Sequence, residues 1–279
     1  MKTTKNTPLS KHFFCLCALF LLSNAVITLP SKNATQFTFL GFLICFIFSF
    51  ILCFIILQIK SVKFLLYLSV LPALYCLFDA FLDFIFFVSQ NLLPETQHFF
   101  IILPFVLTII FFAKNKKSAI LKFSLLAFVF CVIAIIFFFL ATLKDFTFSN
   151  IFIKTLPKAK QLLNQSFPYI KKVVLPSLLL PIFAKLENQQ KKTALSGLTI
   201  GYILIGICLL NSLLLFGNEF SGRLDFPYAQ AISTVTFGNL FTRMDGFSYF
   251  IYLVCCLIKI TVCIDIIKTA LLRERPLFY

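Results

Sequence analysis

Long apolar stretches separated by short polar segments dominate the chain. About 20 apolar residues cross the roughly 30 Å hydrocarbon core of a bilayer as a helix, and the pattern therefore predicts one transmembrane domain over residues 1–279. Prolines inside the third, fourth and sixth apolar stretches predict kinks or breaks in those helices. We predict eight spans, at residues 13–29, 37–57, 64–88, 98–113, 119–141, 168–183, 197–217 and 247–267.

Composition supports an all-α polytopic membrane protein. Of 279 residues, 60% are hydrophobic and only 13% are charged, with 40 phenylalanines and no tryptophan. A water-soluble domain of this length cannot bury so much apolar surface. The bilayer is therefore the expected surrounding of most side chains.

The basic residues behind the net charge of +15 are distributed along the chain by topology and do not form a nucleic-acid-binding patch. Lysine and arginine concentrate before the first predicted span and after the second, fourth, sixth and eighth. The opposite side has fewer basic residues over longer loops, among them Lys144, Lys171 and Lys172. By the positive-inside rule, both termini are predicted to be cytoplasmic.

Reactive side chains give no sign of an enzyme or a cofactor site. All 10 cysteines lie within apolar stretches, where cysteine behaves as a small hydrophobic residue. The two histidines, His12 and His98, are far apart in sequence, and neither metal-ligand spacing nor a glycine-rich phosphate loop is present. We therefore expect no enzymatic activity, no metal and no cofactor.

Asp79, Asp83 and Lys259 are charged residues deep inside predicted spans. Asp79 and Asp83 are four residues apart and share a helical face with Tyr75, while Lys259 lies in the eighth span. Intramembrane carboxylates usually face a bundle interior or a wet cavity. We predict that Asp79 pairs with Lys259 and that Asp83 meets Arg243 of the outer loop, either as structural ion pairs or as part of a ligand, proton or coupling-ion site.

Two polar interruptions are further candidates for substrate binding. Ser23, Asn24 and Ala25 interrupt a Phe- and Leu-rich helix, which suits either an unwound backbone that contacts a ligand or close packing through small residues. Pro176 and Ser177 in the sixth span, together with Pro181, allow the same two interpretations.

Three stretches together resemble one protein family. They are LSKHFFCLCALFLLSNAVITLPS (9–31), NLLPETQHFF (91–100) and FPYAQAISTVTFGNLFTRMDGFSYFIYLVCCLIKITVCI (226–264). Their order and spacing resemble the spore germination permeases, the B subunits of Ger-type germinant receptors in the amino acid–polyamine–organocation superfamily. The resemblance implies a LeuT-like inverted-repeat transporter fold, with broken first and sixth helices around a central substrate site. It also implies about two further helices beyond the segment that ends here at Tyr279, so a C-terminally shortened form of that fold is expected.

The resemblance implies a function and partners as well. It implies a permease-like receptor subunit in the inner membrane of a bacterial spore that senses a small nutrient such as an amino acid. A larger membrane subunit and a lipoprotein subunit are the implied partners. A stand-alone secondary amino-acid transporter and a truncated, non-transporting paralogue remain the alternatives.

Overall fold

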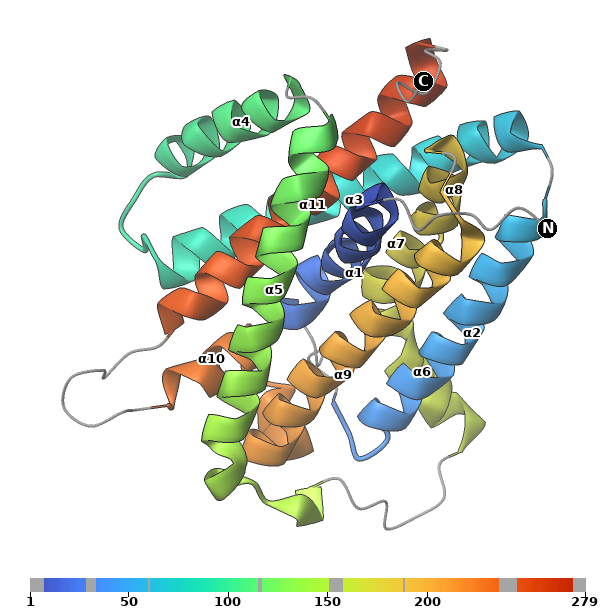
Figure 1. The fold of residues 1–279 in the computed structure, drawn as a ribbon. Coiled ribbons are helices and arrows are strands. Elements are labelled where there is room, and N and C mark those ends of the chain that lie inside the picture. The colour runs from blue at the N-terminus through green and yellow to red at the C-terminus, as the bar shows by residue number, and fades with distance from the viewer. Residues whose placement is uncertain are drawn as a thin grey trace.

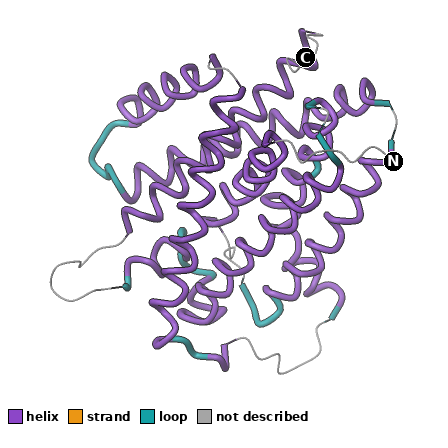
Figure 2. Tube along the Cα trace, in the orientation of Figure 1, coloured by secondary structure: helices purple, strands orange, loops and turns teal. Residues whose placement is uncertain are grey.

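Helices make up almost all of the part of the chain that the structure, a computed structural model, describes: residues 8–28, 34–59, 61–114, 117–150, 158–187, 189–235 and 245–272. Figure 2 shows helices and loops but no strand among the described residues. The long helices are α1 (Pro8–Thr28), α2 (Thr38–Gln58), α3 (Val62–Asn91), α4 (His98–Lys114), α5 (Lys117–Thr142), α6 (Ala159–Tyr169), α9 (Lys191–Ser221) and α11 (Asp245–Leu272). The short ones are η1 (Leu143–Asp145), η2 (Phe148–Asn150), η3 (Ile170–Val174), α7 (Leu175–Ser177), α8 (Leu179–Leu186) and α10 (Pro227–Ser233).

The helices confirm an integral, polytopic membrane protein. Within the described residues, six helical segments are long and apolar enough to cross a bilayer, and two apolar helices, Lys11–Ser23 and His98–Lys114, are shorter. The predicted total of eight spans therefore stays a prediction. At 30 residues, α3 is about 45 Å long, so it must tilt to fit the bilayer. Figure 1 shows α3 crossing the bundle obliquely beside α11.

The apolar helix α1 occupies the middle of the bundle and packs against α9, α11 and α5 (Figure 1). Its closest approach is to α9 and depends on two glycines. A Cβ atom at Gly197 would lie 2.7 Å from the Cβ of Cys17 and 2.9 Å from the carbonyl oxygen of Phe14. A Cβ atom at Gly201 would lie 3.0 Å from Leu21. Small residues thus let the two backbones touch, as is common between membrane helices.

The expected break in the first helix is wrong. The backbone is helical through residues 23–25, within α1 (Pro8–Thr28). Ser23 is fully buried, and its hydroxyl donates to the carbonyl oxygen of Phe20 at 3.1 Å. A serine that bonds its own helix in this way is accommodated without unwinding. Of the two interpretations of this stretch, the described backbone favours close packing.

The sixth span is longer and less regular than predicted. Residues Ala159–Leu186 form one membrane-length segment, instead of 168–183. It begins as α6, passes through the π-helical turn η3, and is interrupted again at Leu178 between α7 and α8. The irregularity expected from Pro176 and Pro181 is confirmed. We call this stretch the Ala159–Leu186 segment.

Candidate functional site

One lysine bridges the two aspartates of the third span. The ammonium of Lys172 donates to Oδ1 of Asp79 at 2.9 Å and also to Oδ2 of Asp83. The aspartates lie on α3 and the lysine lies in η3, so the contact joins two membrane-spanning segments. We call Asp79, Asp83 and Lys172 the ion cluster.

Local geometry explains why these three groups meet. A spacing of four residues places both carboxylates on one face of α3, and the π turn places Lys172 against that face. Single π turns inside α-helices occur frequently at functional sites. The neighbouring Lys171 holds its ammonium 5.6 Å from the ring centroid of Tyr75, one turn below Asp79 on the same stripe.

The ion cluster is enclosed but not sealed. The side chains of Asp79, Asp83 and Lys172 are 12%, 22% and 16% exposed. Charges this enclosed are costly unless they are paired and hydrogen-bonded, and removing one partner leaves the other group uncompensated. The hydroxyl of Tyr75 is buried beside the cluster and has no hydrogen-bond partner among the described residues. The cluster therefore combines two carboxylates and one shared ammonium with one hydroxyl donor that is left for a further group.

Lys259, the predicted partner of Asp79, lies nearby on α11 and is only 1% exposed. It is close enough for its charge to act on Asp83 and on Cys76, both on α3. The ion pair that the structure gives at Asp79 is with Lys172, so the Asp79–Lys259 pairing stays a prediction. Arg243, the predicted partner of Asp83, lies outside the described residues.

The Ala159–Leu186 segment is also tied to α2 by a line of small polar groups. Thr38 donates to Gln165 at 3.0 Å, and the thiol of Cys45 lies 3.5 Å from the carbonyl oxygen of Ser166. Deeper in the bundle, the hydroxyls of Ser49 and Ser177 share a hydrogen bond; we call these two residues the serine pair. Both are fully buried.

Pro181 explains a further contact between α2 and the Ala159–Leu186 segment. A proline has no N–H to give to the carbonyl four residues earlier, which here belongs to Ser177. The thiol of Cys53 donates to that freed carbonyl at 3.3 Å. At the end of α2, Lys185 donates to the carbonyl oxygens of Ile56 and Ile59, both at 2.5 Å. The α2 helix thus follows the segment along its full length.

The remaining predicted site residues lie on α1 and α7. Ser177 belongs to the serine pair and has no exposed surface. Ser23 is buried in α1, and the backbone of Asn24 and Ala25 is part of the same helix. The structure therefore brings together Tyr75, Asp79 and Asp83, with Lys259 close by.

Lys172 is the residue that sequence reasoning missed. The charge pattern groups Lys172 with the outer loop, because basic residues usually lie outside the hydrocarbon. One signal was nevertheless present: the predicted sixth span, 168–183, already contained Lys171 and Lys172. Basic residues inside an apolar span are rare and mark functional sites.

One comparison with known proteins gave a match. The sequence model of one protein family, the spore permeases, described as "Spore germination protein", matches residues 64–272. Searches of curated proteins and of solved structures returned no match, so the LeuT-like topology stays a prediction. The family match covers α3 to α11, including every residue of the ion cluster, and most of the chain. The chain therefore belongs to the family of spore germination permeases.

Proposed function

We propose that this protein is the permease-like subunit of a germinant receptor and that it senses an amino acid at the ion cluster. The observation that carries the proposal is the bridge from Lys172 to Asp79 and Asp83, enclosed within the membrane-spanning helices. Membership of the spore germination family supports the setting. The ligand class follows from the chemistry of the cluster.

An amino acid zwitterion carries both kinds of group that the cluster can bind, an ammonium for the aspartates and a carboxylate for Lys172. Its ammonium can replace that of Lys172 at the aspartates, while its carboxylate is held by Lys172. The hydroxyl of Tyr75, which has no hydrogen-bond partner among the described residues, adds a donor for the carboxylate. A zwitterion brings no net charge into the bundle, so this exchange avoids the cost of an uncompensated buried ion.

Binding would be communicated through the Ala159–Leu186 segment. Lys172 sits in a π turn, and the helix is interrupted again at Leu178. A ligand that separates Lys172 from α3 favours a second position of this irregular segment, and it shifts the equilibrium only to the extent that it binds that position better. The larger membrane subunit and the lipoprotein subunit would receive the signal.

Germination of spores tests the proposal. Spores that lack the gene are complemented with wild type, Lys172→Met or Lys160→Met, and release of dipicolinic acid is followed over a panel of single amino acids and their mixtures. Lys160 lies in the same segment and is exposed, so it is the matched control. We expect wild type and Lys160→Met to restore one nutrient response that Lys172→Met does not.

Two outcomes would overturn the proposal. If the deletion changes no nutrient response, the protein is not a receptor subunit, and uptake of labelled amino acids then tests the stand-alone transporter. If Lys172→Met accumulates in the spore membrane and responds as wild type does, the ion cluster is not the sensing site.

A further inference from the structure

A polar cavity opens at one end of the bundle. It encloses about 670 Å³, a volume within the range of small-molecule binding sites. Its walls come from the residues before α2, from η2, from the start of α6 and from the end of α9, which lie toward the lower end of Figure 1. The predicted topology places this end on the outer side, and we call the space the outer cavity.

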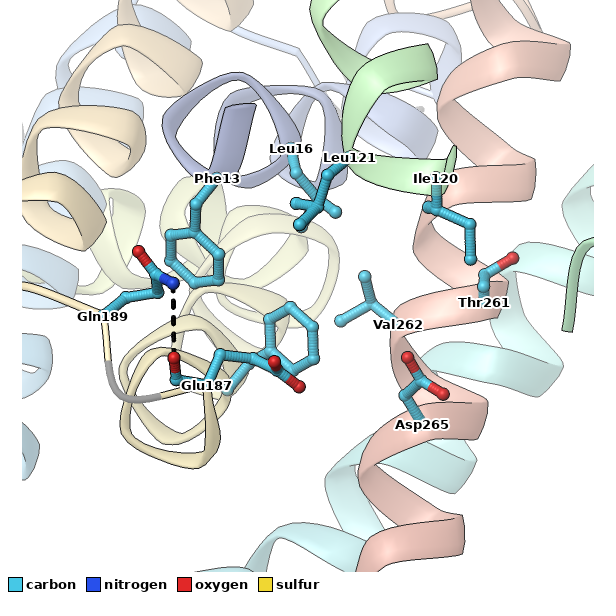
Figure 3. Close-up of a pocket in the computed structure, with 10 residues that line it drawn as sticks. Phe13, Leu16, Ile120, Leu121, Glu187, Gln189, Thr261, Val262 and Asp265 are labelled. Atoms are coloured by element: carbon cyan, nitrogen blue, oxygen red, sulfur yellow. Dashed lines mark hydrogen bonds between the residues drawn. The ribbon is translucent and has the colours of Figure 1, made fainter. Parts of the chain in front are cut away.

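A pocket at the opposite end of the bundle is much smaller. It is lined by residues of α1, α5 and α11 and by Glu187 and Gln189, which follow α8, and its volume is about 20 Å³. Figure 3 shows Glu187 and Asp265 on opposite sides of this pocket. A volume of this order holds a water molecule. Of the two spaces, the outer cavity is therefore the one that fits a small organic molecule.

Four amide side chains line the outer cavity, those of Gln36, Asn150, Gln161 and Asn218. Nδ2 of Asn150 donates to the carbonyl oxygen of Leu214 at 3.2 Å, and Nδ2 of Asn218 donates to the carbonyl oxygen of Asn150. Oε1 of Gln161 accepts from the backbone N–H of Lys158 at 3.0 Å. Because an amide carries both an acceptor and two donors, these backbone bonds fix three side chains and leave two carbonyl oxygens and one NH₂ group for a ligand.

A break in α9 shapes one wall of the outer cavity. Gly217 has a φ of 75° within the bounds of α9, a left-handed conformation that favours glycine. A Cβ atom at this position would lie 3.4 Å from the side chain of Asn150. The break lies between the lining residues Phe216 and Asn218, so the change of direction at Gly217 positions an aromatic ring and an amide in the same wall.

The remaining lining residues favour an uncharged ligand. Three aromatic rings line the outer cavity, those of Phe37, Phe216 and Phe220. Glu219 is the one charged residue among the described residues of the lining. A ligand carboxylate or phosphate therefore has no cation to pair with there, and a zwitterion has a partner for only one of its charges.

An adjoining cavity continues the same chemistry. It encloses about 490 Å³, shares Ala34 and Thr35 with the outer cavity, and is also lined by Asn164, Gln165 and Phe167. None of the described residues in this lining is charged. Amides and an aromatic ring thus extend the polar, uncharged surface along the start of α6 and give room for a ligand longer than one ring.

We propose that the outer cavity binds a neutral polyhydroxyl compound of the size of a mono- or disaccharide. Each hydroxyl of such a compound both donates and accepts hydrogen bonds, which matches the paired donors and acceptors of amide side chains. The C–H groups on one face of a sugar ring pack against the negative faces of aromatic rings. No residue of the ion cluster lines this cavity, so the proposal does not depend on the ligand of the ion cluster.

Direct binding to the purified full chain in lipid nanodiscs tests the proposal. Tritiated glucose and sucrose are the probes, binding is followed by scintillation proximity, and no amino acid is present. We expect saturable binding of at least one of these sugars. Unlabelled sugar should compete with the probe, whereas glucuronate, which adds a carboxylate to the same ring, should compete at least tenfold more weakly because the lining has no cation.

Two variants of the lining locate the binding site. Asn218→Ala removes an amide, and Phe220→Ala removes a ring that is 53% exposed and is therefore dispensable for folding. Each should weaken sugar binding about fivefold, the loss expected for one hydrogen bond or one aromatic contact. Phe148→Ala is the matched control, because Phe148 is an exposed phenylalanine of η2 that does not line the cavity. It should bind sugar as wild type does.

Three results would overturn the proposal. They are the absence of saturable binding of both sugars, wild-type sugar binding by both Asn218→Ala and Phe220→Ala, and competition by glucuronate that equals competition by glucose. Because the assay contains no amino acid and uses no spores, its outcome is independent of the germination experiment on the ion cluster.

Discussion

The bundle contains two kinds of helix contact. Between α1 and α9 the contact is made by glycines, alanine and aliphatic side chains, and the backbones approach so closely that no Cβ fits at Gly197. The Ala159–Leu186 segment instead meets α2 and α3 through hydroxyls, thiols, carbonyls and charges. The first contact is apolar and close-packed, while the second is held by separate polar contacts.

From this difference we assign a fixed role to one contact and a moving role to the other. A close-packed contact tolerates little change, because adding or removing a single methylene group lowers its stability. Polar contacts between membrane helices are individually worth only about 0.6 kcal/mol on average and can exchange partners. We infer that α1 and α9 form the fixed frame, and that the Ala159–Leu186 segment is the part that changes position.

The largest effect is expected in the frame. Gly197→Leu places side-chain atoms where Cys17 and the backbone of Phe14 already lie, and we expect it to cost about 3 kcal/mol of unfolding free energy through overpacking. The thermal midpoint by far-UV circular dichroism in detergent should fall, together with accumulation in the membrane. Wild-type stability in this variant would show that α1 and α9 are not the frame.

The second largest effect is expected when the bridging lysine is replaced. Lys172→Met leaves Asp79 and Asp83 side by side without their shared ammonium, and we expect a loss of about 2 kcal/mol because the site is partly exposed. The triple variant Asp79→Asn, Asp83→Asn, Lys172→Met removes all three charges. It should recover stability but not the nutrient response, which separates the two roles. Recovery of both would contradict the proposed sensing site.

The serine pair should show a smaller effect on stability. Ser177→Ala removes the hydroxyl that bonds Ser49 and Val174, at a cost of about 1 kcal/mol. If the segment moves, the time course of dipicolinic acid release should also change, in either direction, at unchanged protein level. Ser23→Ala, which removes a buried hydroxyl from the frame, is the control and should leave that time course unaltered.

The smallest effect is expected at the start of α2. Thr38→Val keeps the shape of the side chain but removes the hydroxyl that donates to Gln165 and accepts from the backbone N–H of Thr35, and should cost about 0.5 kcal/mol. Thermal midpoints measured in parallel with those of Ser177→Ala would rank the two contacts. A larger loss for Thr38→Val than for Ser177→Ala would reverse the inferred order along the segment.

The sequence predicted the class and the acidic half of the site, because runs of apolar residues and carboxylates inside them are local signals. Asp79 and Asp83 stand out in any inspection of the third span. Lys172 did not, because it lies close to the predicted start of its span at residue 168 and is therefore grouped with the outer loop. The polar residues Gln165 and Ser166 conceal that the segment begins earlier, at Ala159. Gln165 and Ser166 face α2, and only the tertiary fold reveals that they are buried.

The interpretation of α1 failed for a related physical reason. Ser23 can hydrogen-bond to its own helix as readily as it can mark an unwound site, and the sequence does not distinguish these outcomes. Gly197 and Gly201, far away along the chain, decide between them because they provide the surface against which α1 packs.

The ten cysteines, all buried, offer a practical route to the orientation of the protein. Water-soluble maleimides do not reach a buried thiol, so a single cysteine introduced at an exposed position becomes the one labelled site without prior removal of native thiols. Placed at Glu95, between α3 and α4, or at Lys191, at the start of α9, it would be modified from opposite sides of sealed vesicles. Because the native cysteines stay unlabelled, the wild-type chain can be used directly to map which end of each helix faces the cytoplasm.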